Sequence, residues 1–404
     1  MTQTQQLFLQ AAKAALRGKH VDWPQIEAEQ WQELMELAQN QHMVPLLVEA
    51  VYTSAAFRML PEETKWQARK LARQQVFAQT QKDRILYGLL EGMEKAKLPV
   101  LVLKGAACRS LYRLPETRPS SDEDLLVQPE HFEQATQILL KRGFRCEAEE
   151  MPAEAYEVSF VSPEGMHIEL HRHPLDPSLS VLEGANGCFA GVFADKYTIQ
   201  IRGGQIPSMP PHEHMLYLLL HAFKHLIYRG FGLRQMCDIL LWGERYAADI
   251  DWKRLEEQCA SLRAWDFAQA IFTVGRTHLG VELPVECGDR SEQAGILLAD
   301  VFSGGVYGGE SLSRKHSANI TLNAVEAEQK GKKPSVLASV FPARKNLEGR
   351  YPWLSKHPGL LPLAWGKRLA DYAAQPKNED NDPLDSMRIG RERVELLRKL
   401  NVIN

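Results

Sequence analysis

Several features that define particular protein classes are missing from this chain of 404 residues. Its six cysteines are scattered and form no CxxC or other close pair. This usage is typical of free thiols in a reducing compartment and argues against a disulfide framework or a cysteine zinc site. No apolar run approaches the roughly 20 residues of a membrane helix. The first residues, MTQTQQ, lack the basic start and apolar core of a signal peptide, so we expect a cytoplasmic protein.

A strong charge of one sign is also lacking, because the formal net charge is only -3. The overall charge therefore gives no reason to expect a nucleic acid or a membrane as partner. A Walker loop or kinase glycine-rich loop is absent, which ranks a kinase-like phosphotransferase last among the possible phosphate chemistries. The chain is nevertheless long and apolar enough for two or three domains with real cores.

The most informative segment runs from Leu101 to Val127. LVLKG at its start predicts a short buried strand and a glycine turn, and RPSSDEDLLV at its end predicts a second strand. Asp122 and Asp124 are two positions apart, so an extended strand directs both carboxylates to one face. Two neighbouring acids repel each other unless a cation lies between them, and Mg²⁺ prefers such oxygen ligands together with substrate phosphates.

A third acid follows on a later strand, MHIELH, which ends at His171. Alternation places His167, Glu169 and His171 on one face of that strand and its two aliphatic residues on the other. Glu169 is therefore the candidate third carboxylate. His171 is a candidate general base or substrate contact.

Phosphate binding requires donors and positive charge near these acids. Gly105, at a strand-to-helix junction, can expose backbone N–H groups at a helix N-terminus. Lys104 and Arg118 are basic residues close by in sequence. For each of them two interpretations stay open, a phosphate contact or a carboxylate partner of Asp122.

Together these motifs resemble the polymerase-β-like nucleotidyltransferase superfamily. More closely, the chain is similar to a bacterial family of uncharacterised nucleotidyltransferases with a Leu-Lys-Gly turn and an Arg-Pro-x-x-Asp-x-Asp strand. The resemblance extends to LRQMCD at 233–238, YPWL at 351–354 and the segment after Gly390. It implies an NTP substrate, two Mg²⁺ ions, metal ligands and catalytic acids at Asp122, Asp124 and Glu169, and a nucleotide-binding set. That set consists of Lys104, Gly105, Ala106, Arg118 and Ser121.

Two functions follow from this resemblance. The first is transfer of a nucleoside monophosphate to an unknown small-molecule, peptide or protein acceptor. The alternative is a catalytically weak or inactive module that keeps the fold for binding, for example a toxin-antitoxin component. The three intact acids favour the enzyme. Ala106, which lacks the hydroxyl usual after the turn glycine, and the absence of an acceptor motif keep the alternative open.

Basic and histidine residues of a later helix allow weaker hypotheses. His221 and His225 are four apart, but no Glu follows His221 as in the HExxH zinc motif, so a core-edge position is the better interpretation. His221 or Lys224 would otherwise reach the nucleotide from the helical lobe. Arg234 and Asp238, one turn apart, predict an ion pair on a helix surface.

The pattern predicts an α+β fold, with a small mixed-sheet core inserted between N-terminal and C-terminal helical lobes. We expect a helical lobe at 1–95, the core at 96–206, a second helical lobe at 207–330, and a Pro-rich segment with a terminal helix at 331–404. The core order is β-α-β-α-β-β-β. Prolines at 334–362 predict an extended surface segment, and the polar run at 375–382 predicts a loop.

Overall fold

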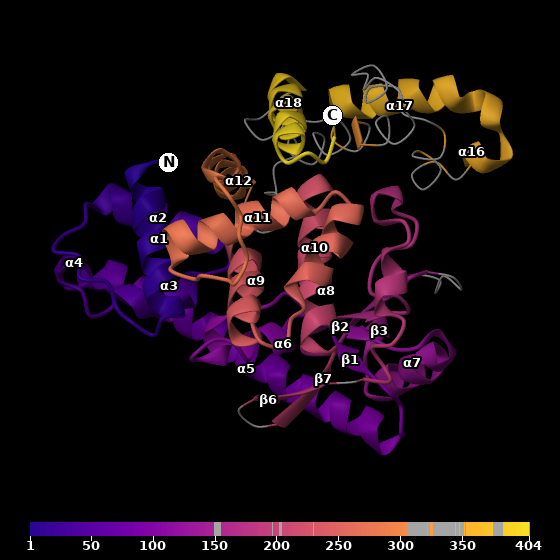
Figure 1. Ribbon diagram of the computed structural model, residues 1–404, viewed down its shortest axis with the longest axis horizontal. Helices are drawn as coiled ribbons and strands as arrows, with labels where there is room; N and C mark the ends of the chain where they lie inside the picture. The colour runs from indigo at the N-terminus through magenta and orange to yellow at the C-terminus, as the bar shows by residue number, and fades with distance from the viewer. Residues whose placement is uncertain are drawn as a thin grey trace.

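The computed structural model describes residues 1–148, 155–195, 197–201, 204–228, 230–304, 351, 353–374 and 383–403, with a few isolated residues between 320 and 350. Helices predominate and surround a small mixed sheet, which confirms the predicted α+β class. Figure 1 shows the N-terminal helices on one side, the sheet low on the other, and the last helices together at the top.

Most of the first 95 residues are helical, as the apolar spacing predicted. The helices are α1 (Gln3–Leu16), α2 (Ala28–Asn40), α3 (Val44–Val51), α4 (Ala55–Met59) and α5 (Glu62–Lys95). A capping box formed by Thr2 and Gln5 begins α1. The 34-residue α5 continues from this group along the bottom of the molecule toward the sheet (Figure 1).

The main sheet has the strand order β1-β2-β5-β4-β3. Its strands are β1 (Leu101–Val102), β2 (Asp122–Leu126), β3 (Arg145–Cys146), β4 (Glu157–Val161) and β5 (His167–His171). Only β2 and β5 run parallel, and the other pairs are antiparallel. Two helices connect the early strands, α6 (Ala106–Arg109) and α7 (Phe132–Lys141). The two acid-bearing strands predicted from the sequence are therefore direct neighbours.

A second, two-stranded sheet is not joined to the first by a strand ladder, but its strand β7 packs against β1. It consists of β6 (Tyr197–Ile201) and β7 (Gly204–Ser208). The sequence predicted β6 but not β7, because Pro207 is a residue that strands usually avoid. The two-residue β3 was also not predicted. The predicted single run of core strands is thus two separate sheets.

Helices return after residue 210. They are α8 (Pro211–Tyr228), α9 (Leu233–Arg245), α10 (Trp252–Ser261), α11 (Trp265–Val274), α12 (Ser291–Gly304), α16 (Trp353–Lys356), α17 (Leu361–Ala374) and α18 (Pro383–Lys399). The expectation of an extended segment up to residue 362 is wrong for its last part, since α16 and a 3-10 turn at Pro358–Leu360 are helical. The rest of 334–350 and the predicted loop at 375–382 lie outside the described residues, apart from single positions.

One apolar core joins the N-terminal helices, the sheets, α8 to α12 and α18, and a second, small cluster packs α16 against α17. The Phe8 ring of α1 packs edge-on against Phe302 of α12, for example. The two faces of β2 have different neighbours. Asp124 faces α8 through Tyr217, whereas Glu123 faces α5 through Arg109. This sandwiching of β2 between α5 and α8 positions the site described next.

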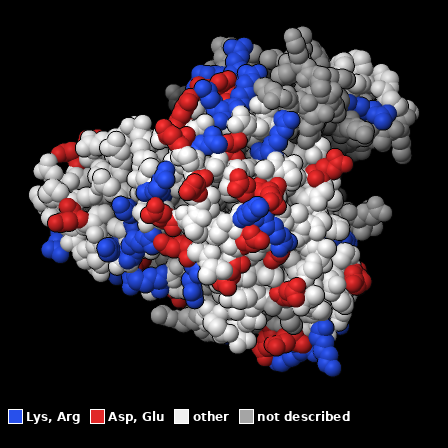
Figure 2. Space-filling model, in the orientation of Figure 1, with Lys and Arg blue, Asp and Glu red and all other residues white. Residues whose placement is uncertain are grey.

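None of the described helices is both long and apolar enough to cross a membrane. On the face shown in Figure 2, Lys and Arg side chains lie interspersed with Asp and Glu.

Candidate functional site

The predicted acids lie side by side on β2 and β5. Asp122 is paired with His167, and Asp124 with Glu169, in parallel register. Residues paired in this way point to the same face of a sheet. The face carrying Asp122, Asp124 and Glu169 is therefore shared by both strands. Asp124 is fully buried, whereas Asp122 and Glu169 line a cavity of about 370 Å³ between the sheet, α8 and α9.

Lys104 supplies a cation between the two aspartates. Its Nζ lies 3.2 Å from Asp122 Oδ2 and 3.0 Å from Asp124 Oδ2. Burial alone lowers the pKa of Lys104, but the two carboxylates outweigh it and raise the pKa well above its usual value. These contacts agree with the interpretation of Lys104 as a carboxylate partner, the second of the two given above. The ammonium also lines the cavity, where a phosphate oxygen could reach it.

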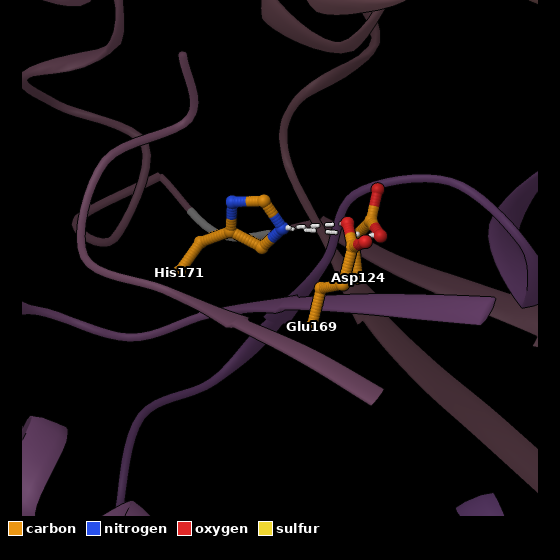
Figure 3. A group of neighbouring side chains, drawn as sticks. All are labelled: Asp124, Glu169 and His171. Carbon is orange, nitrogen blue, oxygen red and sulfur yellow. Dashed lines mark ion pairs between the residues drawn. The ribbon is translucent and has the colours of Figure 1, made fainter. Parts of the chain in front are cut away.

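His171 completes a second group on the same face. Its Nε2 lies 3.8 Å from Asp124 Oδ1 and 3.7 Å from Glu169 Oε2 (Figure 3). One ligand atom from each of these three residues lies within 4.8 Å of the others. Asp124 Oδ1 and both ring nitrogens of His171 are buried without a hydrogen-bond partner. Unpaired buried donors and acceptors are uncommon, and a small divalent ion would satisfy Asp124 Oδ1 and His171 Nε2 together.

The protonation states follow from this crowding. Burial lowers the pKa of His171, but Asp124, Glu169 and Glu157 outweigh it and raise the pKa to about 9. Burial raises the pKa of Glu169, but His171 and Lys104 outweigh it and lower the pKa below its usual value. Without a metal ion, the imidazolium and the Lys104 ammonium are thus the cations that balance the acids.

Gly105 and Ala106 form the turn that the sequence assigned to phosphate. Gly105 has φ +53°, and a Cβ there would lie 2.1 Å from Glu123 Oε2. The Ala106 N–H donates to that same oxygen at 2.8 Å, and Ala106 is buried. This contact corrects the expectation that the Ala106 amide binds phosphate, because the amide already has a carboxylate partner. Gly105 itself lines the cavity.

Glu123 belongs to a buried network that sequence reasoning missed. Arg109, fully buried, donates to Glu123 Oε1 at 2.6 Å, to Asp83 Oδ1 at 2.6 Å and to Ser120 Oγ at 2.7 Å. The network holds β2 from the face opposite the acids. Alternation along β2 does place Glu123 on that face, but no local pattern identifies partners on α5 and α6.

Arg118 and Asp238 form a second buried ion pair. Arg118 Nε donates to Asp238 Oδ1 at 3.1 Å, and Tyr112 donates to the same oxygen at 2.8 Å. Arg118 therefore pairs with Asp238 and not with Asp122. The predicted surface pair between Arg234 and Asp238 is wrong, since Asp238 is buried and Arg234 donates to the Pro119 carbonyl. Ser121, in the same segment, has its carbonyl 3.2 Å from Lys82 Nζ.

One face of α8 adds residues to the cavity. The Tyr217 hydroxyl donates to Asp124 Oδ2 at 3.3 Å and lies 3.2 Å from His221 Nδ1. His221 and His225 are joined by their Nε2 atoms at 2.9 Å, and burial lowers the pKa of His225 to about 3. Lys224 donates to the Tyr156 hydroxyl at 3.0 Å. The histidine pair is hydrogen-bonded to itself and to Tyr217, which sequence spacing alone did not identify.

A small mixed sheet with three acids on one face, set between helical lobes, is the arrangement of a nucleotidyltransferase. A family model described as an uncharacterised nucleotidyltransferase matches residues 27–280, and the chain belongs to this family. The match begins just before α2 and ends after α11, so it includes both sheets and helices on either side of them in the chain. No curated protein matches the chain at a significant level.

Proposed function

We propose that the protein transfers a nucleoside monophosphate from an NTP to a hydroxyl, amine or phosphate of an acceptor, with Mg²⁺ as the metal. The observation that carries this proposal is the shared face of β2 and β5. There Asp122, Asp124 and Glu169 converge, and Asp124 Oδ1 and His171 Nε2 are buried without partners. Membership of the nucleotidyltransferase family supports the same class of reaction.

The donor set fits divalent ions. Asp124, Glu169 and His171 would hold one ion, and Asp122 with Asp124 would hold a second where the Lys104 ammonium now lies. Bound divalent ions would polarise the α-phosphate and favour deprotonation of the acceptor. The imidazole nitrogen of His171 is the one donor that the sequence resemblance did not assign to the metal.

The chain's own residues have separate roles in this proposal. The acceptor oxygen forms a bond to the α-phosphorus, the bond to the β-phosphate oxygen breaks, and pyrophosphate leaves. Glu169, whose carboxylate lines the cavity, would accept the acceptor proton. Lys104 would contact the phosphates once displaced from the aspartates. Lys224, on α8, lies on the cavity wall, where nucleoside or acceptor would bind.

A second candidate is the catalytically weak or inactive binding module. The contact of Lys104 with both aspartates favours it, because an ammonium can balance these acids permanently. All six cysteines are free, which fits a reducing compartment, and we propose a cytoplasmic location for either function.

The test is incubation of the protein with labelled NTPs, Mg²⁺ and cell lysate, followed by measurement of pyrophosphate release and label transfer. Asp124→Asn should abolish transfer and weaken metal binding in calorimetry. Glu164→Gln, an exposed acid in the β4–β5 turn, is the matched control and should retain both. Metal binding without transfer for any NTP would favour the inactive module.

A further inference from the structure

The basic side chains around the cavity differ in how their charge is balanced. Lys104 contacts Asp122 and Asp124, and Arg118 contacts Asp238. Arg234 of α9 also lines the cavity and is only 4% exposed. Within the described part of the chain, no carboxylate lies within 4.0 Å of its guanidinium. Arg234 is thus a buried cation that has no carboxylate partner among the described residues.

The hydrogen bonds of Arg234 are also incomplete. Its Nη1 donates to the Pro119 carbonyl, but its Nε is buried and has no partner. Burying a charge is costly unless it is paired and hydrogen-bonded. The neutral Pro119 carbonyl accepts a hydrogen bond from Arg234 but does not balance its charge. The arrangement therefore points to an anion that is present when the protein works.

Lys82 of α5 reaches the same segment from the other side. Its Nζ donates to the carbonyls of Ser120 at 2.8 Å and Ser121 at 3.2 Å, and it too has no carboxylate within 4.0 Å among the described residues. Arg234 and Lys82 thus both hold the Pro119–Ser121 segment, which leads directly into Asp122. Burial lowers the pKa of Lys82 even though Glu123 and Asp122 act in the opposite direction.

Two residues near Arg234, Arg118 and His42, have features that fit an anion at this place. Arg118 Nη1 is buried without a hydrogen-bond partner, although the rest of its guanidinium binds Asp238. His42, at the corner between α2 and α3, has its pKa lowered to about 4 by burial and then by Arg234 and Arg118. Of these residues, Arg118 and Arg234 line the cavity, whereas Lys82 contacts the carbonyls of the segment that leads into Asp122.

We propose that Arg234 and Arg118 form an anion subsite that holds the triphosphate of the nucleotide beside Asp122, with Lys82 adding positive charge and holding the Ser120–Ser121 backbone in place. This inference rests on the proposed function. It assigns triphosphate binding to these residues and not to the Gly105 turn, because the Ala106 amide of that turn donates to Glu123. The subsite would compensate the buried guanidinium and bring the phosphates next to the acids. Small movements of the two guanidinium groups would direct their unpaired N–H groups to phosphate oxygens.

Calorimetry with inorganic tripolyphosphate in the presence of a metal chelator tests the subsite apart from the metal site. The unmutated protein should bind tripolyphosphate, and Arg234→Gln should weaken binding by about tenfold to a hundredfold, the range for one charged hydrogen bond. Lys82→Gln should weaken it in the same direction, and Arg234→Lys should weaken it less than Arg234→Gln. Absence of binding by the unmutated protein, or equal binding by Arg234→Gln, would overturn the proposal.

Two matched controls remove a basic side chain from the same helices. Arg245→Gln changes an exposed residue at the end of α9, and Arg84→Gln an exposed residue of α5 next to the site. Both should bind tripolyphosphate like the unmutated protein. Equal losses in the controls and in Arg234→Gln would mean that only the general charge of the surface matters, and would overturn the subsite.

Because Arg234 is buried, its variants can fail to fold, so a second measurement uses the unmutated protein alone. Tripolyphosphate should slow hydrogen exchange in peptides spanning 117–124 and 231–238, and leave exchange at α12 unchanged. Slowing confined to other regions would place the anion elsewhere and overturn the proposal.

A competition experiment separates the two sources of such an anion. Tripolyphosphate should compete with ATP and not with AMP, since the subsite is assigned to the triphosphate. Simultaneous binding of ATP and tripolyphosphate would assign the subsite to a phosphorylated acceptor and overturn the proposal as stated. Arg234-dependent binding without any nucleotide transfer would sustain the subsite while contradicting the enzyme function.

Discussion

The Lys104 ammonium lies 3.0 Å from Asp124 Oδ2, at a carboxylate that is fully buried. It also lies 3.2 Å from Asp122 Oδ2, so one lysine links both aspartates of β2. This lysine takes the place that a divalent ion would have in the proposed reaction. Lys104 therefore couples the stability of the metal-free protein to the binding of metal.

Lys104→Gln should destabilise the metal-free protein by about 3 kcal/mol, because it removes one of the two cations that balance the buried Asp124. Divalent metal should recover much of this loss, since it binds the folded acids and not the unfolded chain. Urea unfolding with and without Mg²⁺ measures both effects.

The control for this prediction is Lys95→Gln, which removes an exposed pair with Glu91 at the end of α5. Its effect should stay below about 0.5 kcal/mol. A Lys104→Gln protein as stable as the unmutated one in metal-free buffer would contradict the view that Lys104 balances the acids.

Gly105→Ala should destabilise the protein by more than about 2 kcal/mol. The new Cβ would lie 2.1 Å from Glu123 Oε2, at a backbone with φ +53° and ψ -107° that L-residues avoid. Gly295→Ala, in α12 with open space around it, should be neutral or slightly stabilising. Thermal unfolding of both variants checks the difference, and equal melting temperatures would show that the turn tolerates a side chain.

The face shared by Asp122, Asp124 and Glu169 could be predicted from the sequence because it depends on a local rule. Side chains alternate along a strand, so each strand by itself assigns its acids to one face. The two acid-bearing faces then form one site if the two strands are neighbours, and β2 is indeed paired with β5. The roles of these acids in catalysis stay a prediction.

The partners of the buried bases could not be predicted, because they are distant in sequence. Arg118 pairs with Asp238 across 120 positions, and Arg109 pairs with Asp83 across 26. No periodicity links such residues, and nearness in sequence indicated Asp122 as the partner of Arg118 instead. Arg234 was assigned to Asp238 because helix spacing is the only relation that a sequence shows. Packing of α9 against the segment before β2 decided otherwise.

Arg118→Met should cost about 3–5 kcal/mol, because it leaves the Asp238 carboxylate buried with only Tyr112 as a donor. Adding Asp238→Leu should recover part of this loss, since the double variant has no unpaired charge. A double-mutant cycle by urea unfolding measures the coupling. Additive losses would mean that the two residues do not interact in solution.

The pH dependence of the free energy of unfolding should reveal the lowered pKa of His214. This residue is fully buried, stacks on Trp242 with ring centroids 3.9 Å apart, and has its Nδ1 2.7 Å from Ser208 Oγ. Burial lowers its pKa from 6.5 to about 3. Between these values the unfolded chain binds a proton that the folded chain does not, so stability falls as the pH falls from about 6.5 toward 3.

His214→Gln should lower by one the number of protons that the chain takes up on unfolding. The slope of the free energy of unfolding against pH should therefore fall by about 1.4 kcal/mol per pH unit in this window. His42 and His225, whose pKa values are also lowered by burial, should maintain the remaining slope. The loss of stacking on Trp242 should lower stability at every pH, so the slope is the informative quantity. Urea unfolding at several pH values measures it, with His20→Gln at an exposed position as the control. An unchanged slope in His214→Gln would mean that His214 is protonated in the folded protein.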